Sequence, residues 1–149
     1  MSQSIGIASD HGGKALKEKI QAFLKAEGWN VKDFGVPFDS QQSVDYPDYA
    51  AQLSREVANG SLHRGILVCG TGIGMCIAAN KIQGIRAGLV WDEFTARMSR
   101  QHNDANILCL GERTLNHDRA LDLVRIWLHT EFEGARHQQR LDKIKALEQ

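Results

Sequence analysis

A cysteine followed by a glycine-rich turn is the stretch of this sequence with the clearest capacity for chemistry. Cys69 ends an apolar run, residues 70–74 read GTGIG, and a helical pattern resumes at Met75. The N–H groups of such a loop and the positive end of a helix dipole together bind anions. A thiol at a helix N-terminus ionises readily, so Cys69 could act as a base or nucleophile. The alternative is a small buried hydrophobe, as most free cysteines are.

The glycine-rich loop matches neither common nucleotide-binding motif. A Walker loop ends in Gly-Lys-Ser/Thr, which is absent here. The dinucleotide fingerprint has the spacing G-x-G-x-x-G, whereas this loop has G-x-G-x-G, although Asp92 follows about twenty residues later, where that fingerprint has an acidic residue. A small anion, such as a sugar phosphate or an enediolate, therefore suits the loop better than a dinucleotide does.

A second candidate loop, Asp10-His11-Gly12-Gly13, follows an apolar run near the start of the chain. The first two side chains could be an acid–base pair or could hold a ligand. Alternatively, Asp10 only caps a helix and His11 is a surface residue. The two glycines allow a ligand to approach the backbone closely.

Three arginines could bind a phosphate group. Arg136 and Arg140 are four residues apart and share a helix face, and Arg113 follows a predicted strand. Arg136 falls in a first helical turn, where the helix dipole disfavours positive charge. An ion pair with Glu131 or Glu133 would explain this placement, and a phosphate held by two arginines would explain it equally.

Alternating strand and helix patterns must position these residues. The predicted strands span 4–8, 30–34, 66–69, 85–90 and 106–110, and the predicted helices span 14–27, 47–59, 75–80, 92–101, 117–130 and 136–147. This alternation predicts a single α/β domain, a three-layer α/β/α sandwich around a Rossmann-like parallel sheet, because parallel connections need crossovers. Ligands bind such sheets where the strand order reverses, so the loops holding Asp10 and Cys69 are expected to meet.

A polar run at 100–106 (RQHNDAN) precedes the fifth predicted strand. It could be only a helix C-terminus and turn, where Arg, His and Asn are common. Because this run enters a strand rather than leaving one, it should lie at the sheet edge opposite Cys69. His102 could then reach the chemistry only from a partner subunit, which predicts a dimer with composite sites.

Composition limits the class of protein. The 149 residues are 42% hydrophobic and 24% charged, as in an ordinary globular domain. Eighteen basic and eighteen acidic residues give zero net charge, which argues against nucleic-acid binding, and no apolar run could span a membrane. The three cysteines lack CxxC or zinc spacing, and the first residues lack signal-peptide features. Both observations favour reduced thiols in a cytoplasmic protein, with Cys76 and Cys109 in the core.

Several long motifs together resemble one known family. They are SDHGG at 9–13, DYPDYA at 45–50, CGTGIGMCIAANK at 69–81, GIRA at 84–87, SRQHNDANIL at 99–108 and EGARHQQR at 133–140. In this order, and over essentially the whole chain, they resemble the type B ribose-5-phosphate isomerases, the family that also holds galactose-6-phosphate and allose-6-phosphate isomerases.

The resemblance implies an aldose–ketose isomerase of the pentose phosphate pathway, without metal or organic cofactor, and a strand order of 2-1-3-5-4. D-Ribose 5-phosphate would become D-ribulose 5-phosphate through a cis-enediol. Cys69 would be the base that moves a proton between C1 and C2, because Met75 replaces the glutamate that some members use. Thr71 and the N–H groups of residues 70–74 would stabilise the enediolate.

The resemblance also assigns the remaining roles. Asp10 and His102 would assist ring opening. The family is dimeric or tetrameric, with His102 and Arg113 supplied across the interface and with helix 136–147 contributing to the phosphate site and the dimer. His11 and the three arginines would hold the phosphate, and Tyr46 and Asn103 would line the sugar site. The implied substrate-binding residues are His11, Tyr46, Gly70, Gly72, Gly74, Asn103, Arg113, Arg136 and Arg140.

Two alternatives remain open at this point. The substrate could be another aldose phosphate, such as allose 6-phosphate, galactose 6-phosphate or a tetrose phosphate, because chain length is read by pocket depth. The protein could also be a non-catalytic sugar-phosphate-binding module, although the presence of Cys69, Asp10 and His102 speaks against it.

Overall fold

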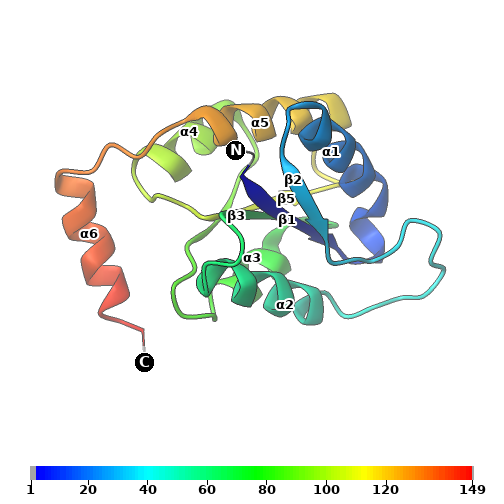
Figure 1. Ribbon diagram of the computed structural model, residues 1–149, viewed down its shortest axis with the longest axis horizontal. Helices are drawn as coiled ribbons and strands as arrows, with labels where there is room; N and C mark the ends of the chain where they lie inside the picture. Colours follow the sequence, from blue (N-terminus) through cyan, green and yellow to red (C-terminus); the bar gives the residue numbers. More distant parts are fainter. Residues whose placement is uncertain (1–2, 149) are drawn as a thin grey trace.

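Parallel strands in the order β2-β1-β3-β5-β4 form the central sheet (Figure 1). The computed structural model describes residues 3–148. Every strand pair in this sheet is parallel, and the order reverses between β1 and β3, so the predicted order 2-1-3-5-4 is confirmed. The strands are β1 (Ser4–Ser9), β2 (Asn30–Asp33), β3 (Arg64–Cys69), β4 (Ala87–Leu89) and β5 (Ile107–Gly111).

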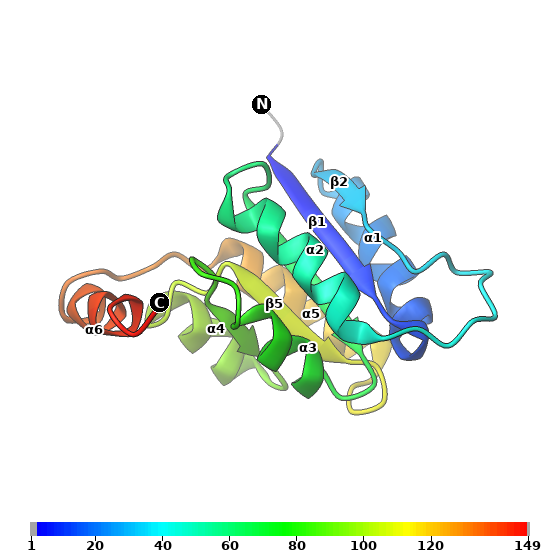
Figure 2. The ribbon, with the colours of Figure 1, turned by 90° about the horizontal axis from the view of Figure 1, so that it is seen from below.

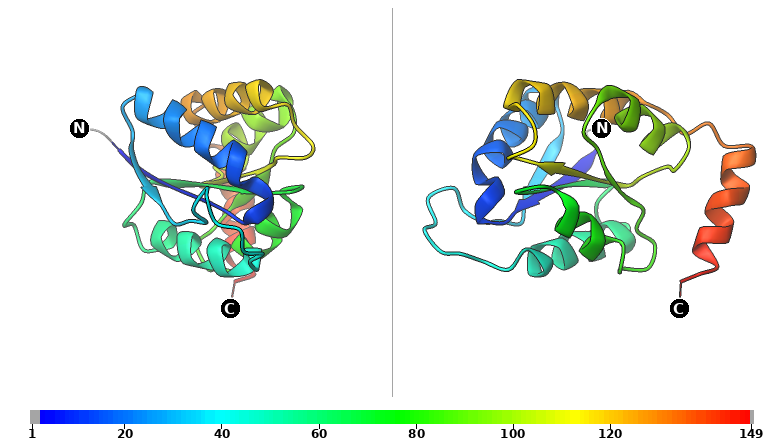
Figure 3. Two further views of the ribbon diagram at one scale, coloured as in Figure 1. Left: turned by 90° about the vertical axis from the view of Figure 1, so that its right-hand side faces the viewer. Right: turned by 180° about the vertical axis from the view of Figure 1, so that it is seen from behind.

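Helices cover both faces of the sheet, as the predicted α/β/α sandwich requires (Figure 2). One layer contains α1 (Lys14–Ala26), α4 (Glu93–Gln101) and α5 (His117–His129), and the other contains α2 (Tyr46–Ala58) and α3 (Ile73–Ala79). A last helix, α6 (Arg136–Lys145), projects from the sandwich near the amino ends of the strands (Figures 1 and 3). Within residues 3–148, no helix is long and apolar enough to cross a membrane.

The period-two alternation of strand side chains divides the core into two clusters. Along β3, Ile66 and Val68 pack with α1 and α5, whereas Leu67 and Cys69 pack with α2 and α3. All four residues are at most 5% exposed, so β3 is buried on both faces. Burying each large aliphatic side chain stabilises the fold by roughly 1.5–3 kcal/mol.

The loop after β1 lies directly against β3. A Cβ atom on Gly13 would be only 2.7 Å from the Val68 carbonyl oxygen, so this close approach requires glycine. The loop itself is a short 3₁₀ turn, η1 (His11–Gly13), rather than the irregular loop that was predicted. The turn forms because Asp10 Oδ1 accepts a hydrogen bond from Gly12 N at 2.9 Å.

Two element boundaries differ from the prediction for local reasons. Helix α3 begins at Ile73 instead of Met75, with Gly72 as its N-cap residue. Thr71 Oγ1 accepts the Ile73 N–H at 3.2 Å, which turns the chain into the helix two residues earlier than predicted. Strand β4 is shorter than the predicted 85–90, because the backbone N–H of Arg86 donates to the side chain of Asn106 rather than to a neighbouring strand.

Candidate active site

Three loops meet at the carboxyl edge of the sheet. A Cβ atom on Gly12, after β1, would lie 3.5 Å from the backbone nitrogen of Gly70, after β3. A Cβ atom on Gly70 would in turn lie 3.4 Å from Arg113 Nη1, after β5. The expectation that the Asp10 and Cys69 loops meet at the switch point is therefore confirmed, and Arg113 joins them.

The glycine loop presents unpaired donors next to the thiol. Gly72 has a φ of 80° and ends the turn in the left-handed region that favours glycine. Its N–H donates to Cys69 Sγ at 3.1 Å. Within residues 3–148, the backbone N–H groups of Gly70, Thr71 and Gly74 have no acceptor. These three groups can therefore hold an anion.

Cys69 is 5% exposed and sits between this loop and the end of β3. The donor from Gly72 stabilises negative charge that develops on its sulfur. Its carbonyl oxygen accepts the backbone N–H of Glu112 at 2.9 Å, which holds the residue in register with the end of β5. Burial alone would fit a core cysteine, but a core cysteine does not require an N–H donor aimed at its sulfur.

Of the other two cysteines, Cys109 is buried in the core cluster on the α2 and α3 side, as predicted, whereas Cys76 is only partly buried and packs against that cluster. A hydrogen bond between their side chains lowers the pKa of Cys76 to about 7, and burial opposes this shift. The same hydrogen bond, together with complete burial, raises the pKa of Cys109. Cys76 is therefore a readily ionised thiol, but it lies inside α3 and away from the free N–H groups of the loop.

Asp10 and His11 combine structural and chemical features. Asp10 is 7% exposed, and its Oδ1 caps η1, so the structural alternative for this residue is confirmed. Within residues 3–148, the other carboxylate oxygen makes no hydrogen bond. His11 Nδ1 accepts the N–H of Val44 at 3.1 Å, which leaves the proton of the neutral ring on Nε2. His11 is exposed, so this Nε2–H can donate to a ligand.

Tyr46 reaches the glycine loop from the first residue of α2. Its ring lies so close to Gly74 that a Cβ atom there would be 2.8 Å from the hydroxyl oxygen and 2.5 Å from a ring carbon. Glycine at this position therefore lets the phenol pack against the first turn of α3. The structure thus groups Tyr46 with Cys69 and the loop, although the two segments are distant in sequence.

The remaining predicted site residues lie at the opposite edge of the sheet. His102 caps the C-terminus of α4, and its ring stacks on His137 of α6 with centroids 4.1 Å apart. Arg136 and Arg140 are exposed on α6. Within one chain, these residues therefore lie far from Cys69. This agrees with the prediction that His102 lies at the edge of the sheet opposite Cys69.

Arg113 was expected to come from a partner subunit, and that expectation is wrong. It follows β5 directly, so parallel pairing with β3 places it beside Gly70 of its own chain. Its backbone N–H also donates to the Gly70 carbonyl at 2.9 Å. The guanidinium can serve the anion site without any contribution from a second chain.

The ion pairs proposed as an alternative role for the C-terminal arginines do not form. Within the described part of the chain, neither Arg136 nor Arg140 pairs with Glu131, with Glu133 or with any other acidic group. Arg113 likewise has no acidic partner among residues 3–148. All three guanidinium groups are available to an anionic ligand.

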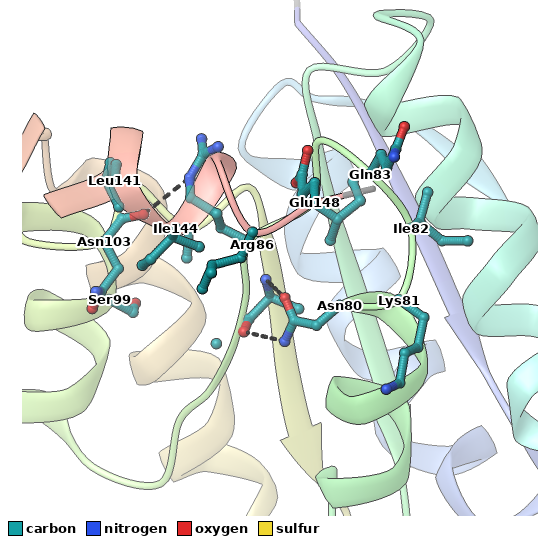
Figure 4. Close-up of a pocket in the computed structure, with 15 residues that line it drawn as sticks. Asn80, Lys81, Ile82, Gln83, Arg86, Ser99, Asn103, Leu141, Ile144 and Glu148 are labelled. Carbon is teal, nitrogen blue, oxygen red and sulfur yellow. Dashed lines mark hydrogen bonds between the residues drawn. The ribbon is translucent and has the colours of Figure 1, made fainter. Parts of the chain in front are cut away.

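A cavity of about 780 Å³ separates α6 from the body of the domain (Figure 4). Leu141 and Ile144 line it from α6, and Asn103 and Arg86 line it from the body of the domain. The Asn103 carbonyl oxygen accepts a hydrogen bond from Arg86 Nε at 3.1 Å. Asn103, expected in the sugar site, therefore lies on the α6 side of the molecule with His102.

Glu112 is a positioning residue that sequence reasoning missed. Its carboxylate accepts the backbone N–H of Leu16 in the first turn of α1 at 2.6 Å. Its own N–H bonds to the Cys69 carbonyl, so one residue ties the helix after the Asp10 loop to the thiol. Its position beside Arg113, just after a strand, was the only available signal, because the Leu16 partner depends on the packing of α1.

The fold and the site together define the class of this protein. It is a Rossmann-like α/β protein whose switch-point crevice holds an anion-binding loop, a buried thiol and a buried carboxylate. Arginines without an acidic partner among residues 3–148 lie both in this crevice and on a projecting C-terminal helix. Such a combination suits a small anionic metabolite rather than a dinucleotide.

Comparisons with known proteins specify the family. A family model described as Ribose/Galactose Isomerase matches residues 5–144. Ribose-5-phosphate isomerase B of Escherichia coli (strain K12) is 45% identical over 147 residues, covering 99% of this chain and 97% of that protein. The chain therefore belongs to the ribose/galactose isomerase family.

Solved structures agree with this membership. The Clostridium thermocellum ribose-5-phosphate isomerase B has a TM-score of 0.94 and 52% identity, over 97% of this chain and 96% of that one. The Mycoplasma genitalium ribose-5-phosphate isomerase B, solved with bound ribulose-5-phosphate, has a TM-score of 0.91 and 46% identity, over 98% and 96% of the two chains.

The contact between Glu112 and Leu16 yields a prediction about activity. Glu112→Ala should lower the free energy of unfolding by about 1–3 kcal/mol, because it leaves a helix N–H without its charged acceptor. It should also lower kcat/KM about tenfold, because the Asp10 and Cys69 loops lose their common anchor. Steady-state assays and urea unfolding measure both. Glu112→Gln, which retains an acceptor oxygen, is the control and should lose less. An unchanged kcat/KM in folded Glu112→Ala would contradict the positioning role.

Proposed function

We propose that this protein is a ribose-5-phosphate isomerase that interconverts D-ribose 5-phosphate and D-ribulose 5-phosphate through a cis-enediol. The observation that carries the proposal is the set of unpaired N–H groups of Gly70, Thr71 and Gly74 beside Cys69. Family membership and the relative that was solved with bound ribulose-5-phosphate support the same substrate.

Proton transfer between C1 and C2 is the central step. Cys69, as a thiolate, removes the proton from C2 of the open-chain aldose and returns it to C1. Negative charge develops on the substrate oxygens, and preorganised N–H donors at that position are usually the largest contribution to such a step. The donors stand next to Cys69, so one loop holds both the base and the groups that stabilise the product of its action.

Ring opening must come first, because only the open-chain aldose has an acidic C2 proton. One carboxylate oxygen of Asp10 has no hydrogen-bond partner in the described part of the chain, and it can accept the proton of the anomeric hydroxyl. His102 can donate a proton to the ring oxygen if it is supplied by a partner subunit. Asn103 follows His102 directly and would contact the sugar hydroxyls, and Tyr46 would line the same site from α2.

Phosphate binding holds the substrate away from the reacting carbons. His11 offers an Nε2–H, and Arg113 lies beside Gly70 in the same chain. Arg136 and Arg140 would complete the phosphate site from the partner's copy of α6. Binding energy gained at the phosphate fixes the pose of C1 and C2 against Cys69.

We infer that the protein functions as a homodimer with composite sites, and a tetramer of such dimers would keep the same sites. Exposed apolar side chains near both sets of residues support an interface. Ile73 and Ile77 on α3 are 52% and 58% exposed, and Ile144 on α6 is 48% exposed. The reaction would serve the pentose phosphate pathway in the cytoplasm.

A panel of aldose phosphates tests the proposed function directly. Metal-free protein should convert ribose 5-phosphate with a kcat/KM above the values for allose 6-phosphate, galactose 6-phosphate and erythrose 4-phosphate, because the phosphate site fixes the distance to C1. Product formation is measured by ketose detection. A higher kcat/KM for a six- or four-carbon substrate would reassign the substrate. If folded protein converts none of these aldose phosphates, the result would favour a non-catalytic binding module.

Replacement of the base should separate chemistry from binding. Cys69→Ala should lower kcat by about 10²–10⁴-fold, as the loss of a general base does. The dissociation constant of inorganic phosphate, measured by equilibrium binding, should stay near that of the wild type, because the phosphate ligands are intact. Cys76→Ala is the matched control and should retain activity. Normal turnover by Cys69→Ala would exclude it as the base.

Subunit complementation tests the composite site. Cys69→Ala and the double variant Arg136→Met/Arg140→Met should each be nearly inactive at low substrate concentration. A heterodimer purified with two tags should recover about half of the wild-type activity, because one of its two sites then has both halves intact. If Cys69 and the arginines act within one chain, both sites of the heterodimer are defective and no activity returns.

A further inference from the structure

Three potential metal ligands converge where α6 meets the end of α4. His102 caps α4, Glu133 precedes α6, and His137 lies in the first turn of α6. One ligand atom from each lies within 4.8 Å of the other two. The cluster is remote from the glycine loop, and its three residues come from two separate segments that tertiary folding brings together.

His137 is the fixed member of this cluster. It is 4% exposed, and within residues 3–148 its Nε2 has no hydrogen-bond partner. A buried polar nitrogen without a partner is unfavourable, so this nitrogen favours a ligand. Imidazole nitrogen is the commonest side-chain metal ligand in proteins, so a metal ion is a suitable partner for this atom.

The other two ligands can move toward His137. The side chains of His102 and Glu133 are 39% and 50% exposed, and His102 Nε2 lies 4.0 Å from Glu133 Oε1. Tetrahedral coordination with bonds of about 2.0–2.1 Å places ligand atoms about 3.3 Å apart. Because the two imidazoles are stacked with planes 15° apart, the His102 ring must turn so that both lone pairs converge. Within residues 3–148, it makes no other side-chain hydrogen bond that opposes this rotation.

We propose that His102, Glu133 and His137 bind one divalent transition-metal ion of the zinc class, and that the bound ion inhibits the isomerase by withdrawing His102 from ring opening. Two imidazoles and a carboxylate match the donor set of zinc, with water in the fourth position. The carbonyl groups at the C-terminus of α4 favour a cation there, whereas Arg136 opposes it. Mg²⁺ is disfavoured, because it prefers oxygen ligands.

Binding is tested without reference to activity. Calorimetric titration of metal-free protein with Zn²⁺ should give one site per chain, and Mg²⁺ should give none. Glu133→Gln and His137→Gln should each weaken Zn²⁺ binding at least tenfold, whereas Glu131→Gln, an exposed glutamate of the same segment, should not. Glu133 is on the surface, so its variant also guards against misfolding as an explanation. Unaltered Zn²⁺ affinity in both Gln variants, or no binding to the wild type, would overturn the site.

Cys69 is the competing zinc ligand and needs its own control. Cys69→Ser should retain stoichiometric Zn²⁺ binding, and Co²⁺ bound to wild-type protein should lack the charge-transfer band of a thiolate ligand. Loss of binding in Cys69→Ser, or a thiolate band with Co²⁺, would place the metal at the catalytic loop and overturn the proposal.

The inhibitory effect rests on the role proposed for His102, so it is measured separately. Zn²⁺ should inhibit wild-type ribose 5-phosphate turnover, and a chelator should restore it. Each rate is expressed relative to the metal-free rate of the same variant. On this scale, half-inhibition of Glu133→Gln should need at least tenfold more Zn²⁺ than half-inhibition of the wild type. Binding without inhibition would overturn the inhibitory role and leave the metal site. Binding to a protein that isomerises no sugar phosphate would instead show that the proposed function has failed.

Discussion

The parallel pairing of β3 between β1 and β5 is the constraint on which this site depends. Ser9 lies opposite Val68, and Cys69 lies opposite Gly111. The chain therefore leaves all three strands at the same edge and at nearly the same height, and the next few residues of each must share one crevice. Hydrogen bonds from Glu112 and Arg113 to the turn after β3 then hold this arrangement. A slip of one residue in either pairing would point Cys69 into the opposite core layer.

Glycine makes this convergence physically possible. Three chain segments can lie in contact at the strand ends only where no Cβ atom intervenes. Gly13, Gly72 and Gly111 occupy such positions, because a Cβ atom on each would lie within 3 Å of the backbone of Val68, Leu110 and Thr71, respectively. The same absence of side chains leaves backbone N–H groups uncovered beside the Cys69 thiol. Close packing and anion binding are thus consequences of one feature, and a larger residue in this loop would disturb both.

The separation between the two edges of the sheet gives a physical reason for association. Residues that follow a strand gather at one edge, and residues that precede a strand gather at the other, so His102 cannot approach Cys69 within a chain. Helix α6 extends this second edge outward, with Arg140 exposed and a cavity beneath it. The buried His137 joins α6 to the end of α4 by stacking on His102. The contact that orients the projecting helix therefore involves the histidine proposed for ring opening.

The sequence by itself determined the alternation of strands and helices, the position of the glycine loop and the edge at which Asp10 and Cys69 lie. These features follow from local periodicity and turn chemistry, and parallel topology fixes the rest. Only the tertiary structure decided that Arg113 belongs to the site of its own chain, that Glu112 binds a backbone group 96 residues away and that His137 stacks on His102. Such contacts depend on how helices pack against the sheet, and no pattern within a short segment specifies that packing.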